Sequence, residues 1–102
     1  ICEKASHCLV LFASLSPNSV IAALSTSSGR QHWIGALEES TVLGVTVHVL
    51  KTLRTLFASD SKFVKVVQAD NLAYLAVSGK EKDTDRAVSS LARDIVSLYL
   101  GN

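Results

Sequence analysis

Residues 5 to 29 include no Asp, Glu, Lys or Arg, and this uncharged stretch limits the possible folds more than any other feature. A segment of that length without charge raises the question of a membrane span, which needs about 18 consecutive apolar residues. Serines, threonines and Pro17 interrupt it, so that it has no run of about 18 apolar residues to span a bilayer. The sequence therefore predicts a segment in a protein core, no transmembrane helix and no binding to a membrane.

The side-chain pattern within and after this stretch predicts three β-strands. In residues 6–15 both alternating sets of side chains are apolar, which is typical of a strand buried on both faces. Residues 16–18 are Ser-Pro-Asn and have the composition of a turn, so residues 19–25 are expected to return as the second strand of a hairpin. Residues 31–37 are expected to form a short third strand.

The stretch 41–58 alternates like a strand at its beginning, but a helical wheel resolves the ambiguity. On the wheel, nearly all of its polar residues fall within an arc of roughly 100°, and the apolar residues fill most of the rest. The pattern predicts an amphipathic helix that is capped by Ser40 or Thr41. The polar, outward stripe of this helix includes His48 and Lys51.

The last part of the chain predicts a second hairpin and a second helix. Residues 63–67 and 72–77 are expected to be the fourth and fifth strands, joined by a tight Asp-Asn turn. From Val88 onwards apolar residues recur at helical spacing, and Asp83 or Thr84 is expected to cap this last helix.

These elements define the expected fold as a single α+β domain over residues 1–102. The predicted order is β-β-β-α-β-β-α, with one five-stranded, mostly antiparallel sheet and both helices packed on one of its faces. The sequence shows no internal repeat and no linker. The uncovered face of the sheet would then expose roughly 500 Å² of apolar surface, which is at the upper limit for a monomer.

That uncovered face predicts a protein partner, either a second copy of the chain or a homologous subunit, and so a homodimer or a heterodimer. Four aromatic residues could anchor the partner, and two residues on the outward stripe of the first helix could dock to it. These candidate partner-binding residues are Phe12, Trp33, Phe63, Tyr74, His48 and Lys51. Core packing of the four aromatic residues and simple solvent exposure of the other two are the alternatives.

The charge and cysteine content excludes one class of partner and indicates a compartment. The net charge is +1 and Lys and Arg are not clustered, so the chain lacks the basic patch that nucleic-acid binding requires. Cys2 and Cys8 would lie roughly 20 Å apart on one strand, which is too far for a disulfide. Two free thiols fit a reducing compartment, and we expect a cytoplasmic protein.

The sequence contains no motif for catalysis, cofactor binding or metal binding, and we expect none of these. His7 and Cys8 would point to opposite faces of a strand. Asp83 and Asp85 lack the glycine and the distal glutamate of a calcium loop. The competing class is a small thiol-dependent enzyme that uses Cys8, and rapid alkylation of Cys8 in the native protein would favour it.

Five segments together look like one known family. They are residues 6–12 (SHCLVLF), 20–24 (VIAAL), 33–37 (WIGAL), 63–67 (FVKVV) and 75–80 (LAVSGK). Their order, with one long helix before the fourth segment and another after the fifth, is similar to that of the small proteasome-assembly chaperones of the third and fourth kinds.

This resemblance implies a non-enzymatic protein that pairs with a homologous subunit through its sheet and assists assembly of the 20S proteasome α-subunit ring. Proteasome α-subunits would then be the partners, and no single binding residue is transferred. A roadblock, longin or other profilin-like adaptor is the alternative interaction module. Such adaptors normally have three strands between their two helices, whereas two are expected here.

Overall fold

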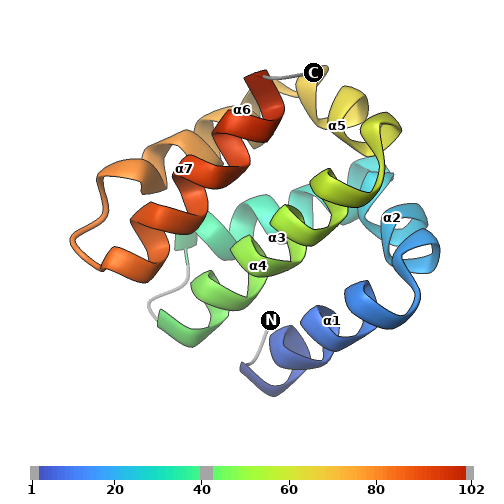
Figure 1. Ribbon diagram of the computed structural model, residues 1–102, viewed down its shortest axis with the longest axis horizontal. Helices are drawn as coiled ribbons and strands as arrows, with labels where there is room; N and C mark the ends of the chain where they lie inside the picture. The colour runs from blue at the N-terminus through green and yellow to red at the C-terminus, as the bar shows by residue number, and fades with distance from the viewer. Residues whose placement is uncertain (1–2, 40–42, 101–102) are drawn as a thin grey trace.

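The computed structural model describes residues 3–39 and 43–100, and the side chains of residues 7–39 and 43–98. Every regular element within these ranges is helical (Figure 1). The elements are α1 (Glu3–Leu15), α2 (Pro17–Ser25), α3 (Ser27–Glu39), α4 (Leu43–Ser59), α5 (Ser61–Gln68), α6 (Asn71–Ser78), the 3-10 helix η1 (Gly79–Lys82) and α7 (Arg86–Leu100). The described part of the chain forms no β-strand, so its fold is all-α.

The expected α+β fold is therefore wrong. All five segments that the side-chain pattern assigned to strands lie within helices, namely residues 6–15, 19–25, 31–37, 63–67 and 72–77. The physical reason is that a short apolar run bounded by turn residues fits a buried strand and a buried helix equally well. The two predicted helices are confirmed, as α4 and α7. Ser40 and Thr41, the expected caps of the first, lie outside the described residues.

Two groups of residues that were expected to form hairpin turns begin helices instead. Pro17 occupies the start of α2, where its missing N–H and its fixed φ are favourable. Asp70 is the N-cap of α6, and its Oδ1 accepts hydrogen bonds from the N–H groups of Leu72 (3.1 Å) and Ala73 (3.3 Å). Pro, Asn and Asp favour turns and helix starts alike, so local composition does not separate the two.

The helices repeat in order and in the spacing of their first residues, although the sequence predicted no internal repeat. The helices α2, α3 and α4 have 9, 13 and 17 residues, and α5, α6 and α7 have 8, 8 and 15. The second group begins at residues 61, 71 and 86, which is 44, 44 and 43 residues after the starts of the first group at 17, 27 and 43. We call α2–α4 the first repeat and α5–α7 the second repeat. A period of about 40–47 residues is typical of α-solenoids.

The long helices α1, α4 and α7 lie side by side and run in the same direction, with α4 in the middle (Figure 1). We call these three helices the long-helix stack. Behind it α3 and α6 pack against each other and run in the opposite direction, while α2 and α5 close one end (Figure 1). Each repeat thus contributes one helix to each layer, which is the arrangement of a helical-repeat protein.

The core lies between these layers and is centred on α4. Its largest fully buried side chains include Trp33, Leu37, Leu50, Leu53, Leu56, Phe63 and Ile95. The rings of Phe57 and Phe63 meet edge to face, with their centroids 5.5 Å apart. Because α4 packs against α1, α3 and α7, only one side of it faces solvent.

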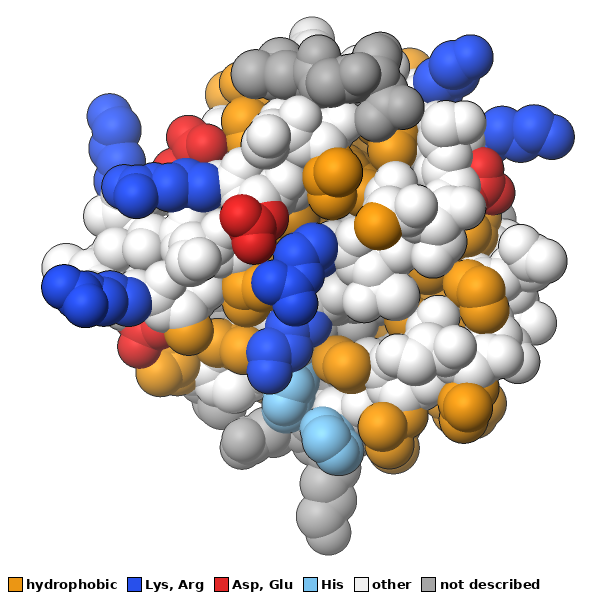
Figure 2. Space-filling view, viewed as in Figure 1, with side chains coloured by type: hydrophobic (Ala, Val, Ile, Leu, Met, Phe, Trp, Pro, Cys, Tyr) orange, Lys and Arg blue, Asp and Glu red, His pale blue; other side chains and the backbone are white. Residues whose placement is uncertain are grey.

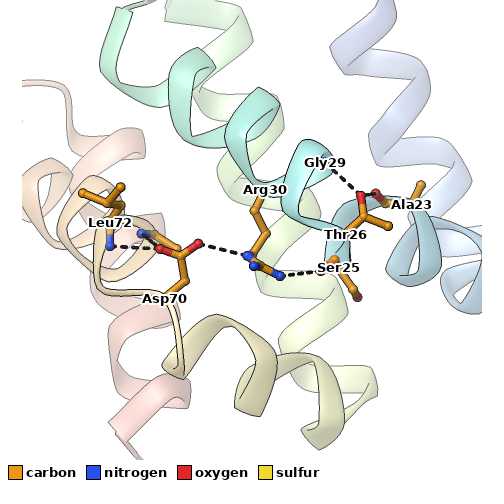
Figure 3. A network of polar contacts seen from close by, with 8 residues as sticks. Ala23, Ser25, Thr26, Gly29, Arg30, Asp70 and Leu72 are labelled. Carbon is orange, nitrogen blue, oxygen red and sulfur yellow. Dashed lines mark hydrogen bonds and ion pairs between the residues drawn. The ribbon is translucent and has the colours of Figure 1, made fainter.

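One polar contact fixes the first repeat against the second (Figure 3). Arg30 in the first turn of α3 donates from Nε to Asp70 Oδ2 at 2.9 Å, and from Nη1 to the carbonyl of Ser25 at the end of α2. Both charged side chains are about one-fifth exposed, so solvent screens the pair less than a surface ion pair. Since Asp70 also caps α6, a single carboxylate links α3 to α6 and stabilises the start of α6.

The turn between α2 and α3 depends on Thr26 and Gly29 (Figure 3). The Gly29 N–H donates to Thr26 Oγ1 at 2.9 Å, and the Thr26 hydroxyl donates to the Ala23 carbonyl at 3.2 Å. A Cβ added at Gly29 would clash with that same carbonyl of Ala23. The close approach of the two helices therefore requires glycine at this position.

Candidate protein-docking site

The helix α1 presents an apolar face to solvent at one end of the long-helix stack. Leu11, Phe12 and Leu15 are exposed by 51%, 60% and 81%. Together with the exposed Cys8 they line an open hollow of about 210 Å³. Positions 8, 11, 12 and 15 follow the i, i+3, i+4, i+7 spacing, so these side chains share one side of the helix. We call this set the α1 face.

The α1 face exists because α1 is apolar on more sides than its neighbours cover. Ala13 is fully buried, and Leu9 and Val10 are partly buried, on the part of α1 that meets the other helices. No Asp, Glu, Lys or Arg occurs from residue 5 to residue 29, so none of the exposed residues from His7 to Leu15 is an Asp, Glu, Lys or Arg. An amphipathic helix with solvent on that side would normally have polar residues there.

The opposite end of the stack has the reverse character. The exposed side of α7 carries Arg86, Ser90, Arg93 and Ser97, which recur at helical spacing on one side. Figure 2 shows charged side chains over α5 and α7, and hydrophobic side chains without charged ones along the lower right edge, over α1. Of the two ends, only the one formed by α1 is apolar.

The surface of the stack between α1 and α7 is polar. The rings of His7 on α1 and His48 on α4 lie 5.2 Å apart, centroid to centroid. Arg54 on α4 pairs with Asp94 on α7 at 3.5 Å, and Lys51 is exposed between these two contacts. Figure 2 shows His side chains near Lys and Arg side chains on this surface. Side chains of neighbouring helices contact one another across this surface.

The predicted partner-binding residues fall into three groups. Phe12 lies on the α1 face, and His48 and Lys51 lie on the polar side of α4 as the helical wheel predicted. Trp33 and Phe63 are fully buried in the core, which is the alternative given for them. Tyr74 is partly buried and lines a small apolar cavity of about 10 Å³. The structure thus brings Phe12 together with three residues that the sequence analysis did not single out as a group.

Leu11, Leu15 and Cys8 were missed for a definite reason. As a strand, residues 6–15 would place Phe12 and Cys8 on one face and Leu11 and Leu15 on the other. As a helix, the same residues place all four on one side. The helical spacing of these positions is the signal that could have found them.

The residues around Cys8 limit the chemistry that is possible at the α1 face. Cys8 is exposed, and the other side chains that line the hollow are those of two leucines and a phenylalanine. Within residues 7–39 and 43–98, no three His, Cys, Asp or Glu side chains are grouped so that they could hold a metal ion. Likewise, no helix in the described part of the chain has the length and apolar content to cross a membrane.

The described helices form a small all-α fold with a polar exposed side on α7 and an apolar exposed side on α1. Comparison with protein-family models, curated proteins and solved structures found no match to this chain.

Proposed function

We propose that this chain is a non-catalytic protein-interaction module that docks a protein partner on the α1 face. The carrying observation is the cluster of Leu11, Phe12 and Leu15, each more than half exposed, around an open hollow. Large apolar side chains that form a group on a protein surface mark an interaction site far more often than isolated ones do.

The energetics of burial support a docking role. Covering a large aliphatic or aromatic side chain contributes about 1.5–3 kcal/mol relative to leaving it exposed. Most of the energy of an interface comes from a few central anchors, and the cluster of Leu11, Phe12 and Leu15 would supply such anchors. The polar residues beside the cluster, His7 and Ser14, would then form part of its rim.

The identity of the partner is not supported by any of these observations. The predicted relation to proteasome-assembly chaperones rests on a hairpin whose residues form α1 and α2 here, so it stays a prediction and our proposal names no proteasome subunit. The profilin-like adaptor alternative rests on the same strand order. The cytoplasmic location, argued from the two cysteines, also stays a proposal.

The competing proposal of a thiol-dependent enzyme depends on Cys8. Its thiol is exposed, which such an enzyme requires, but the described side chains that line the hollow with it, Leu11, Phe12 and Leu15, include no acid or base. The same surroundings are those of a docking surface. We therefore favour protein interaction over catalysis.

Site-specific photo-crosslinking tests this function. A benzophenone amino acid replaces Leu15 on the α1 face or, as a matched control, Leu72 on α6, which is exposed by 64%. In cells that express the chain, we expect a discrete crosslinked species from position 15 only, and we expect Phe12→Ala in the same chain to remove it. No crosslink from position 15, or the same species from both positions, would contradict the proposed function.

A further inference from the structure

We infer that the segment of the partner that covers the α1 face is an amphipathic helix whose contacting side carries no charge. This helix lies parallel to α1, so that it adds one more helix to the long-helix stack. This inference rests on the proposed docking function. It adds the conformation, the direction and the surface chemistry of the partner segment.

Within the chain, two long helices each have one side covered by another long helix. In the stack α1–α4–α7, α1 covers one side of α4, and α4 covers the corresponding side of α7 (Figure 1). Both covering elements are long helices that run parallel to the helix they cover. The α1 face is the next position in this series, and it is the one position of the series that no described helix covers.

A head-to-tail second copy of the chain does not fit the α1 face. Such a copy would place the outer side of its α7 on the α1 face, and that side carries Arg86, Ser90, Arg93 and Ser97. Burial of two guanidinium groups against Leu11 and Phe12 without partners would cost free energy.

The apolar character of the α1 face defines the surface of the partner helix. The α1 face has no charged residue, and the hollow beside the small Cys8 side chain is apolar. A facing helix therefore needs large apolar side chains at i, i+3 or i+4 and i+7, with one of them filling the hollow, and its own charges on the far side. Parallel long helices pack in this way when ridges of one fit grooves of the other.

Disulfide tethering through Cys8 tests the inference with a defined probe. The protein carries Cys2→Ser, so that Cys8 is its single thiol. The probe is a synthetic peptide with the sequence of residues 43–59, the helix that covers α7 in this chain. It bears a Cys-Gly-Gly linker at its N-terminus or a Gly-Gly-Cys linker at its C-terminus. A peptide of the same composition with scrambled order, linked at its N-terminus, is the reference.

The position of the linker reports direction because Cys8 lies before Leu11, Phe12 and Leu15 along α1. A peptide linked at its N-terminus covers these residues in the parallel direction, and one linked at its C-terminus covers them in the antiparallel direction. In exchange with 2-mercaptoethanol, we expect the N-linked peptide to be tethered about tenfold more than the scrambled one, and the C-linked peptide to match the scrambled one. Leu15→Ala should remove the gain, and Leu72→Ala should keep it.

Each other outcome overturns the inference in a distinct way. Equal tethering of the N-linked and scrambled peptides would show that a helix is not preferred, and stronger tethering of the C-linked peptide would show the antiparallel direction. A solution mass of twice 10.9 kDa for the free chain, reduced to 10.9 kDa by Leu15→Ala, would identify a second copy as the occupant. If the photo-crosslink from position 15 persists in any of these cases, the docking function stands and only the parallel helix is lost.

Discussion

Arg30 and Asp70 form an ion pair, with 2.9 Å between Nε and Oδ2, that joins two helices which begin one repeat apart. The same carboxylate accepts two backbone N–H groups at the start of α6. The residue 44 positions earlier is Thr26, whose Oγ1 accepts the Gly29 N–H near the start of α3. Equivalent sites in the two repeats are thus both polar residues that stabilise helix starts, but only the second also bonds across repeats.

Removal of the Asp70 side chain should therefore cost more than removal of an ordinary N-cap. Asp60 is the matched control, because it caps α5 through one bond to the Lys62 N–H (2.8 Å), and it forms no ion pair with any side chain that the structure describes. We expect Asp60→Ala to lower the free energy of unfolding by about 1 kcal/mol, and Asp70→Ala by about 2–3 kcal/mol. Urea unfolding followed by circular dichroism measures both. Equal losses would show that the Arg30 contact contributes nothing.

The two glycines of α3 should respond in opposite directions to the same substitution. A Cβ at Gly29 would meet the Ala23 carbonyl, whereas a Cβ at Gly35 would meet no atom within 4 Å. We expect Gly29→Ala to lower the free energy of unfolding by roughly 1–3 kcal/mol through overpacking. Gly35→Ala should raise it by about 0.5–1 kcal/mol, since alanine favours the helix. Thermal unfolding of both variants checks this, and a stable Gly29→Ala protein would contradict the close approach of α2 and α3.

Phe12 and Phe63 provide a direct test of where the structure places two residues that the sequence treated alike. Phe63 is fully buried and meets Phe57, whereas Phe12 is 60% exposed. Phe63→Ala should cost about 3–5 kcal/mol of stability. Phe12→Ala should change the stability of the free chain by no more than about 0.5 kcal/mol, because it removes surface contacts only. Similar losses at the two positions would mean that Phe12 is buried in the free chain.

The Arg54–Asp94 pair should contribute little to stability. Its 3.5 Å contact joins side chains that are 45% and 54% exposed, so water and salt screen it. We expect Arg54→Ala to change the free energy of unfolding by less than about 0.5 kcal/mol, and Arg30→Ala to cost more. A loss above about 1 kcal/mol for Arg54→Ala would show that the pair holds α4 to α7.

The two long helices α4 and α7 could be predicted from the sequence because their polar residues occupy one side. In α7, Val88, Leu91 and Ile95 are buried while Arg93 and Ser97 are exposed, which is the pattern that a helical period requires. The helices α1 and α2 could not be separated from strands in this way. Neither contains a charged residue between 5 and 25, so nothing distinguishes a period of 3.6 from a period of 2.

The repeat was hidden for a related reason. Between residues 16–39 and 60–83, at a spacing of 44, only Val20 with Val64 and Gly35 with Gly79 are identical. Burial is shared at Val20 with Val64 and at Trp33 with Val77, but Phe63 and Val67 are buried where Ser19 and Ala23 are exposed. What repeats is the order and spacing of the helices, which becomes visible only when the helices are placed. The α1 face could not be predicted for a similar reason, because its residues lie on one side only when residues 8–15 form a helix.

The measurement that tests the central claim most directly is the stability of the free chain without the α1 face. The variant Leu11→Ala/Phe12→Ala/Leu15→Ala removes all three large exposed side chains while it keeps good helix formers in α1. If the face is open to solvent and reserved for a partner, its free energy of unfolding in urea stays within about 1 kcal/mol of that of the unsubstituted chain. A loss of about 5 kcal/mol or more would contradict the account, because it would show that these side chains belong to the core of the chain.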